Sequence, residues 1–208
     1  MHTQSKHTQS QLSPEMAYSI LKEGNERFVK NLKANRNLLQ QVNETKEGQF
    51  PFATILSCMD SRTSAELLFD QGLGDIFSIR IAGNILNEDI LGSMEFATKV
   101  VGTKIILVLG HTKCGAIVGA CNNVELGNLT KVLDKIKPAI EAENITQSER
   151  TGANIAFVNN VTENNVHLNI AKIKKESPII AELESSGAIK IVGGIYNVET
   201  GKVSFYES

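Results

Sequence analysis

Short apolar runs alternate with helix-like stretches along most of the chain. Four runs have the length and the β-rich composition of strands, and they cover residues 52–57, 76–81, 104–110 and 189–196. The helix-like stretches cover residues 64–71, 89–101, 127–142, 151–175 and 178–186. Strands that alternate with helices predict an α/β fold, in which a mostly parallel central β-sheet is flanked by helices.

The two ends of this pattern predict an N-terminal helical arm and a C-terminal β-hairpin. Ser13 and Pro14 form a helix start, because serine caps the first turn and proline is favoured at the first helical position. The apolar positions that follow at helical spacing are Ala17, Ile20, Leu21, Phe28 and Leu32. Residues 34–48, rich in Asn, Gln and Glu, are predicted to be a connecting segment. Near the C-terminus, Thr200-Gly201 stands between two β-type runs, which favours a hairpin turn.

The chain predicts one folded domain preceded by a short tail. Residues 1–12 are polar and repeat HTQS at 2–5 and 7–10, which is typical of a disordered or flexible tail. The histidines of the repeat could bind a stray metal ion, but a solvated arm is the preferred interpretation. Nothing within residues 13–208 resembles a linker, so we expect a single α/β domain there.

Composition and charge exclude several classes of function. The hydrophobic fraction of 41% and the charged fraction of 21% are ordinary for a globular protein. A formal net charge of -2 gives no electrostatic basis for binding nucleic acid or an anionic membrane surface. No apolar run is long enough to span a bilayer, and the first residues lack the apolar stretch of a secretory signal. We therefore expect a cytoplasmic protein that binds neither nucleic acid nor a membrane.

The cysteines pose the main chemical question. Cys58, Cys114 and Cys121 are too few and too unevenly spaced for a disulfide framework. In a reducing compartment they are ligands, nucleophiles or inert core residues. Cys121 follows Cys114 by seven residues, on the next predicted helix, where it reads as a small buried hydrophobe.

Two predicted strands end in residues suited to binding a metal. The run at 52–57 leads directly into CMDSR (58–62), and the run at 104–110 leads into HTKCG (111–115). Ligand sites in open parallel sheets lie beyond the carboxyl ends of the strands. Cys58, His111 and Cys114 supply the thiolate and imidazole ligands of a catalytic zinc site, which keeps a fourth position for water.

Asp60 and Arg62 give this site a chemical role. Because two thiolates neutralise the charge of zinc, bound water is acidified less than at an all-histidine site. Asp60 is placed to orient that water and accept its proton, and Arg62 can hold the Asp60 carboxylate in a bidentate pair. If this pair broke, Asp60 could become a fourth metal ligand and close the site.

Simpler interpretations remain for each motif alone. An Asp-x-Arg motif is usually a surface ion pair of little energetic consequence, and an isolated His-x-x-Cys is often chance. The main rival is a thiol enzyme in which Cys114 is the nucleophile and His111 its base. That hypothesis leaves Cys58, Asp60 and Arg62 without a role.

Together, CMDSR (58–62) and GHTKCG (110–115) resemble the paired signature of the β-carbonic anhydrases. The resemblance runs from about residue 15 to residue 206 and includes IRIAGN (79–84) and YNVETG (196–201). It implies one Zn²⁺ per chain and reversible hydration of CO2 to bicarbonate and a proton through zinc-bound hydroxide. It also implies a homodimer or homotetramer whose interface completes each pocket.

The resemblance also implies a substrate pocket. In the subgroup that resembles the plant enzymes, a Gly-Gln-x-Pro segment supplies a hydrogen-bond donor to bicarbonate, and here GQFP makes Gln49 that residue. Phe77 and Ala82 match positions that line the family's apolar CO2 pocket, and Phe96 stands where many members have tyrosine. The backbone N–H near Gly115 would help to orient the substrate.

One departure from the family concerns regulation. Members that are inhibited by a second bicarbonate have Trp and Gly where this chain has Ile55 and Ser57, although Arg80 and Tyr196 could match the rest of that site. We therefore expect an accessible site at neutral pH, with Asp60 held by Arg62 and not bonded to zinc.

Two alternatives use the same metal site. The first is hydrolysis of carbonyl sulfide or carbon disulfide, since relatives with those activities share the ligands. The second is an inactive, zinc-stabilised binding protein, against which Gln49, Asp60 and Arg62 argue, because a structural site needs none of them.

Overall fold

A computed structural model describes residues 2–206 of the chain. Its centre is a five-stranded sheet in the order β2-β1-β3-β4-β5. The first three pairings of this order are parallel, and β5 joins β4 antiparallel. The predicted α/β class, the mostly parallel sheet and the C-terminal hairpin are confirmed.

The bounds of the elements agree with most of the predicted ranges. The strands are β1 (Ala53–Ser57), β2 (Ile76–Arg80), β3 (Ile105–His111), β4 (Lys190–Tyr196) and β5 (Val203–Tyr206). The helices are α1 (Lys6–Gln11), α2 (Pro14–Val29), α3 (Leu38–Thr45), α4 (Ala65–Leu68), α5 (Glu88–Glu95), α6 (Gly115–Cys121), α7 (Gly127–Asp134), α8 (Lys137–Ala142), α9 (Ile155–Glu176) and α10 (Pro178–Ser185). A 3₁₀ turn, η1 (Ala82–Asn84), follows β2, and a π-helical segment, η2 (Phe96–Val101), continues α5.

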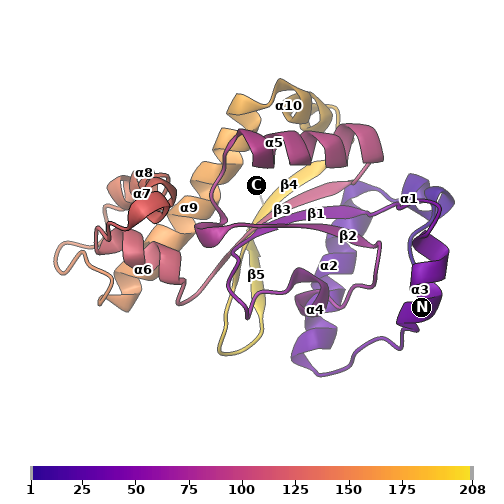
Figure 1. Cartoon of the computed structure of the whole chain (residues 1–208), viewed down its shortest axis with the longest axis horizontal. Coiled ribbons are helices and arrows are strands. Elements are labelled where there is room, and N and C mark those ends of the chain that lie inside the picture. Colours follow the sequence, from indigo (N-terminus) through magenta and orange to yellow (C-terminus); the bar gives the residue numbers. More distant parts are fainter. Residues whose placement is uncertain (1, 207–208) are drawn as a thin grey trace.

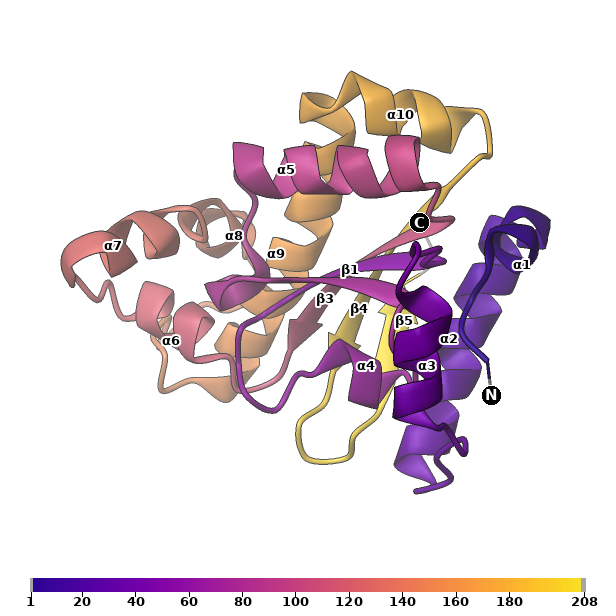
Figure 2. The same cartoon turned by 45° about the vertical axis from the view of Figure 1, so that its right-hand side comes forward.

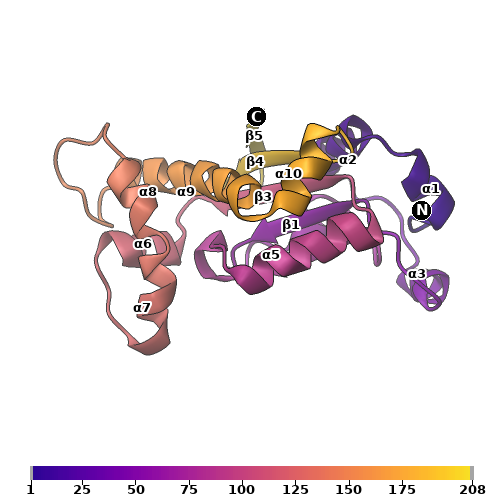
Figure 3. The same ribbon diagram turned by 90° about the horizontal axis from the view of Figure 1, so that it is seen from above.

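The central strands are buried on both faces, which explains their continuous apolar runs. Ile55 and Leu107 point to one face, where they pack with residues of α2 and α4. Leu56 and Ile106 point to the other face, where α5, α9 and α10 cover the sheet. Figure 1 shows these two helical layers above and below the strands, and Figure 3 looks down on the layer of α5, α9 and α10.

The two ends of the sheet are covered by different helices. The shorter helices α6, α7 and α8 lie beyond the carboxyl ends of β1 and β3, whereas α1 and α3 lie at the opposite end (Figure 2). A third apolar cluster fills the carboxyl end and includes Cys58, Cys114 and residues of α6, α8 and α9. The residues just before β1 and those just after it therefore lie at opposite ends of the sheet.

The N-terminal region differs from its predicted form. Residues 1–12 are expected to be a disordered or flexible tail, but Lys6–Gln11 form helix α1, capped by Ser5. The side chain of Gln9 is buried and donates to the carbonyl of Pro51 at 2.7 Å. The predicted connecting segment 34–48 also contains a helix, α3, capped by Asn37.

Two further differences concern where helices end. Ser13 and Pro14 start α2 as predicted, but the helix ends at Val29, and Asn31 turns the chain with a φ of 53°. Leu32 is consequently 61% exposed and does not belong to the buried stripe. The predicted helix 127–142 is interrupted after Asp134, and Pro138 lies in the first turn of the second part, α8.

Within residues 2–206, none of the helices combines the length and the apolar character needed to cross a membrane. The longest, α9, has charged and polar residues along its length.

Candidate metal centre

The carboxyl ends of two neighbouring strands bring the predicted ligands together. Cys58 follows β1 directly, His111 ends β3, and Cys114 caps the start of α6. Because β1 and β3 are parallel partners, their ends meet at one edge of the sheet. The ligand atoms of Cys58, His111 and Cys114 all lie within 4.8 Å of one another, and the two sulfurs are 3.9 Å apart. All three side chains are buried.

The imidazole of His111 is oriented for a metal ion. Its Nδ1 lies 2.9 Å from the carbonyl of Thr112, and since a carbonyl can only accept, Nδ1 carries the proton. Nε2 is then left with a free lone pair. It is buried and has no hydrogen-bond partner among residues 2–206. Burying an acceptor without a donor costs free energy unless a cation binds its lone pair, so Nε2 has the properties of a metal ligand.

The two sulfurs are surrounded by hydrogen-bond donors. The Gly83 N–H donates to Cys58 Sγ at 3.4 Å, and the backbone amides of Ala116 and Ile117 favour the charged form of Cys114. The pKa of Cys58 is lowered, first by its hydrogen bond with Cys114 and also by the Gly83 N–H. The pKa of Cys114 is raised because Cys58 beside it takes the negative charge and because the thiol is buried. A bound cation would allow both sulfurs to ionise.

Asp60 and Arg62 lie beside this cluster as a bidentate ion pair. Arg62 Nε donates to Asp60 Oδ1 at 2.9 Å, and Nη2 donates to Oδ2 at 2.8 Å. Asp60 Oδ2 is 3.9 Å from His111 Nε2, so the carboxylate borders the metal position. The hydrogen bonds from Arg62 hold the pKa of Asp60 well below its usual range. Asp60 therefore acts as an ionised acceptor at neutral pH.

The loop that carries Cys58 and Asp60 is fixed through its backbone. Thr63 Oγ1 donates to the carbonyls of Cys58 and Asp60, at 2.9 Å each. Arg80, the last residue of β2, donates from Nη2 to the Asp60 carbonyl at 2.7 Å. Sequence reasoning did not find this positioning role of Thr63 and Arg80, because contacts to backbone carbonyls have no motif.

Two of the predicted pocket residues lie next to the metal cluster. Ala82 is half-buried in η1, directly before Gly83. Gly115 follows Cys114 and is exposed, and a Cβ on Gly115 would meet no atom within 4 Å. The space beside Gly115 is thus open to a small molecule.

The other predicted pocket residues lie elsewhere in the chain. Gln49 precedes β1, whereas Cys58 follows it, and five residues of strand at about 3.3 Å each separate the two ends. Gln49 is exposed and lines an open hollow with Thr45 and Leu73. Phe77, near the start of β2, and Phe96 have ring centroids 6.4 Å apart, and Phe96 is 51% exposed. One chain alone does not bring these three residues to the metal cluster.

Cys121 is separate from the cluster. It ends α6, is 6% exposed, and belongs to the apolar packing around that helix. Burial raises its pKa to about 11, so it remains a neutral thiol, in agreement with the structural role expected from the sequence.

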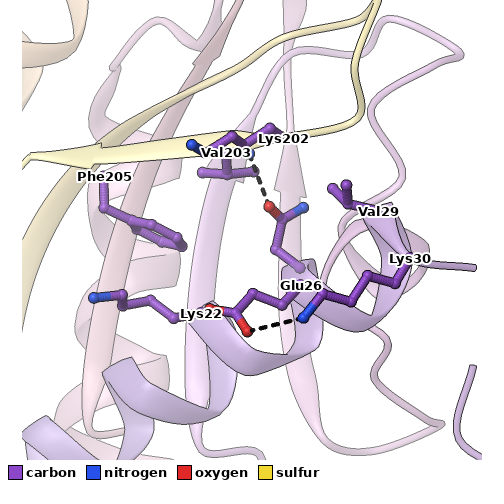
Figure 4. A pocket seen from close by; sticks show the side chains of 8 residues that line it. Lys22, Glu26, Val29, Lys30, Lys202, Val203 and Phe205 are labelled. Carbon is purple, nitrogen blue, oxygen red and sulfur yellow. Dashed lines mark hydrogen bonds and ion pairs between the residues drawn. The ribbon is translucent and has the colours of Figure 1, made fainter. Parts of the chain in front are cut away.

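A cavity of about 210 Å³ lies between α2 and β5, away from the metal cluster (Figure 4). Its apolar lining includes Val203 and Phe205, and its carboxylate, Glu26, pairs with Lys30 at 3.8 Å. In its wall, the Val203 N–H donates a hydrogen bond to Asn25 Oδ1 at 2.8 Å. The residues that line this cavity include neither His nor Cys.

Comparison with known proteins gives one consistent family. The family model described as carbonic anhydrase matches residues 53–203. Carbonic anhydrase 2 of Mycobacterium tuberculosis is 35% identical over 198 residues, which cover 91% of each chain.

Solved structures show the same fold. The β-carbonic anhydrase CcaA superposes with a TM-score of 0.72 and 26% identity, over 91% of this chain and 95% of that one. A tetrameric β-carbonic anhydrase of Sordaria macrospora superposes with a TM-score of 0.68 and 22% identity, over 80% of this chain and 85% of the other.

Proposed function

This chain belongs to the β-class carbonic anhydrases, and on that premise we propose that it catalyses the reversible hydration of CO2 with one Zn²⁺ per chain. The ligands would be Cys58, His111 and Cys114. The observation that carries the proposal is the convergence of three buried ligand atoms within 4.8 Å, one of them an imidazole nitrogen that has no hydrogen-bond partner in the described part of the chain. Two sulfurs and one nitrogen are a donor set that zinc accepts, and they leave a fourth position open.

The metal would lower the pKa of a water molecule and so supply the nucleophile for CO2. The residues around it prepare that chemistry. His111 is held in the tautomer that presents Nε2, because Nδ1 donates to the Thr112 carbonyl. The Gly83 N–H shares the charge of the Cys58 sulfur, which limits how much negative charge the ligands add.

We assign Asp60 the role of orienting the water at the metal position. Its carboxylate, which borders the metal position, would accept a hydrogen bond from that water and so hold it toward the substrate. Arg62 holds Asp60 in place through two hydrogen bonds and keeps it ionised. The pair also keeps the carboxylate from swinging onto the metal, so the site stays accessible at neutral pH.

The substrate would approach beside Gly115, where the surface is open. Ala82, directly before Gly83 in η1, would supply an apolar neighbour. An apolar wall suits CO2, which is poorly hydrated, and polar groups confined to one side would orient it.

We propose that a second copy of the chain completes the pocket. Gln49 would donate a hydrogen bond to bicarbonate, and Phe77 and Phe96 would line the CO2 side. All three are remote from the metal cluster of their own chain, and Gln49 and Phe96 are exposed, as groups that serve a neighbouring chain must be. The similar enzyme of Sordaria macrospora is tetrameric, and we propose that this chain forms a dimer or a tetramer through the same kind of pairing.

The experiment that tests the proposal measures metal content and CO2 hydration by stopped flow on the same preparation. We expect close to one zinc per chain and hydration that is lost when the metal is chelated and regained when zinc is restored. Release of sulfide from carbonyl sulfide or carbon disulfide is measured in parallel. Zinc-loaded protein without CO2 hydration would contradict the proposal and leave either the sulfide chemistry or an inactive binding protein.

A further inference from the structure

The turn η1 contacts the sulfur of Cys58 through a strained segment of backbone. Gly83, whose N–H donates to Cys58 Sγ, has a φ of 68°, and Asn84 after it has a φ of 41°. A side chain at Gly83 would be strained by this φ, and its Cβ would lie 3.3 Å from Ala116 Cβ and 2.8 Å from the flexible end of Ile136, so glycine is favoured there. Asn84 has a Cβ and adopts the left-handed region at a cost in free energy. The surroundings must therefore hold the turn in this conformation.

Two asparagines of α9 supply that hold. Asn165 Nδ2 donates to the Gly83 carbonyl at 2.9 Å, and Asn169 Nδ2 donates to the Asn84 carbonyl at 3.0 Å. They are one helical turn apart and so share a face of α9. Asn165 is 2% exposed and Asn169 is 6% exposed, and both hydrogen bonds are buried. The helix thus grips two successive carbonyls of the turn.

We propose that Asn165 and Asn169 are positioning residues for the metal centre: they hold the 83–84 turn so that the Gly83 N–H stays directed at the Cys58 sulfur. The inference rests on the proposed function, since it requires Cys58 to bind the metal. An N–H hydrogen bond withdraws charge from a thiolate and so changes its strength as a ligand. Partners of metal ligands typically alter metal affinity by about 10- to 100-fold.

A simpler role would be structural. Buried carbonyls need donors in any protein, and asparagines that only satisfy them would change stability without changing the metal centre. Asn164 offers a matched control on the same helix. Its Nδ2 donates to the carbonyl of Ala139 at 3.3 Å, on a different element from the turn.

The experiment compares Asn165→Leu and Asn169→Leu with Asn164→Leu in the full chain loaded with Co²⁺. The sulfur-to-cobalt charge-transfer band reports the electron density on the cysteine sulfurs. Zinc affinity is measured by competition with a chelating dye. We expect the band to move to longer wavelength in Asn165→Leu and Asn169→Leu, and zinc affinity to fall by about 10-fold or more. Asn164→Leu should match the wild type in both.

Unchanged band position and zinc affinity in folded Asn165→Leu and Asn169→Leu would overturn the inference while leaving the proposed function intact. A wild-type protein without any sulfur-to-cobalt band would overturn both. Should the leucine variants not fold, Asn165→Ser and Asn169→Ser replace them, because serine remains polar but is too short to reach the carbonyl.

Nuclear magnetic resonance of the ¹¹³Cd-loaded wild type tests the first link without any substitution. A scalar coupling between ¹¹³Cd and the Gly83 amide proton, transmitted through the Cys58 sulfur, is expected. A metal-loaded protein without this coupling would contradict the inference.

Discussion

The two ends of the parallel sheet differ in how far their candidate site residues are buried. At the carboxyl end, Cys58, His111 and Cys114 are buried. The Gly83 N–H donates to the Cys58 sulfur, and Arg62 holds the neighbouring Asp60 carboxylate. At the amino end and the β2 edge, Gln49 and Phe96 are exposed.

This difference in burial distinguishes the ligand cluster, which one chain assembles by itself, from exposed residues that could contact a second chain. The end with the candidate metal ligands is assembled by adjacent strands of the same sheet within one chain. The residues proposed to orient the substrate lie about a strand length away, and two of them, Gln49 and Phe96, are exposed, where they could serve a second copy. This division predicts that substitutions at the two ends have different consequences.

The largest effect is expected from Cys58→Ser, which removes one of two sulfur ligands. Zinc content should fall to near zero, and CO2 hydration should fall by at least about 10³-fold, because the nucleophile depends on the metal. Cys121→Ser is the matched control, since Cys121 is a buried cysteine outside the cluster. Metal analysis and stopped-flow hydration check both variants. Full zinc content in Cys58→Ser would refute the assignment of this ligand.

Asp60→Asn should keep the metal but slow turnover by about 10²-fold, as expected for loss of a group that accepts from the water at the metal position. The amide is isosteric but presents a donor where the carboxylate presented an acceptor. Zinc content distinguishes this outcome from loss of the site. Unchanged kcat in zinc-loaded Asp60→Asn would show that Asp60 has no part in the reaction.

Gln49→Ala should lower kcat/KM by about 10-fold, the size of one lost hydrogen bond to a charged substrate. Mixed dimers of Gln49→Ala with Asp60→Asn then test whether Gln49 and Asp60 of one pocket come from different chains. If the two halves of each pocket come from different chains, one pocket of the mixed dimer carries both substitutions and the other carries neither.

Isolated mixed dimers, made from two differently tagged chains, should therefore recover about half of the wild-type rate per dimer. Each homodimer alone serves as the control. Activity no higher than the mean of the two parent homodimers would mean that Gln49 acts within its own chain or not at all.

The smallest effect concerns Asp75, a carboxyl at the amino end of β2. Burial raises its pKa, against hydrogen bonds from the backbone of Gly72 and Gln4. The native state then holds the proton at pH values where the unfolded chain has lost it, so stability from this group falls as pH rises from about 4 through the raised pKa. Asp75→Asn should remove that dependence. Denaturant unfolding of both proteins across this pH range checks it, and parallel curves would contradict it.

The sequence predicted the sheet and the metal cluster because both depend on local patterns. Apolar runs marked the strands, and each ligand motif followed a strand directly, so the parallel arrangement alone brought Cys58 and His111 together. The helix α1 was missed because its stability comes from a distant contact, Gln9 to the Pro51 carbonyl, and from a polar cap. Apolar spacing carries no signal of either.

The same reason hid the groups that act through the backbone. Asn165 reaches the Gly83 carbonyl across 82 residues of sequence, and Arg80 reaches the Asp60 carbonyl across 20. A backbone carbonyl accepts from any donor, so no residue type at the other end reveals the pairing. The family resemblance named Gln49, Phe77 and Phe96, but only the fold revealed that they lie apart from the metal cluster of their own chain.

X-ray absorption at the zinc edge, on protein purified at neutral pH, would identify the atoms bound to the metal. We expect close to one zinc per chain, with two sulfur neighbours at about 2.3 Å and two nitrogen or oxygen neighbours at about 2.0–2.1 Å. A protein that holds no stoichiometric zinc, or a zinc ion with three or four sulfur neighbours, would contradict a centre built from Cys58, His111 and Cys114 with one position open.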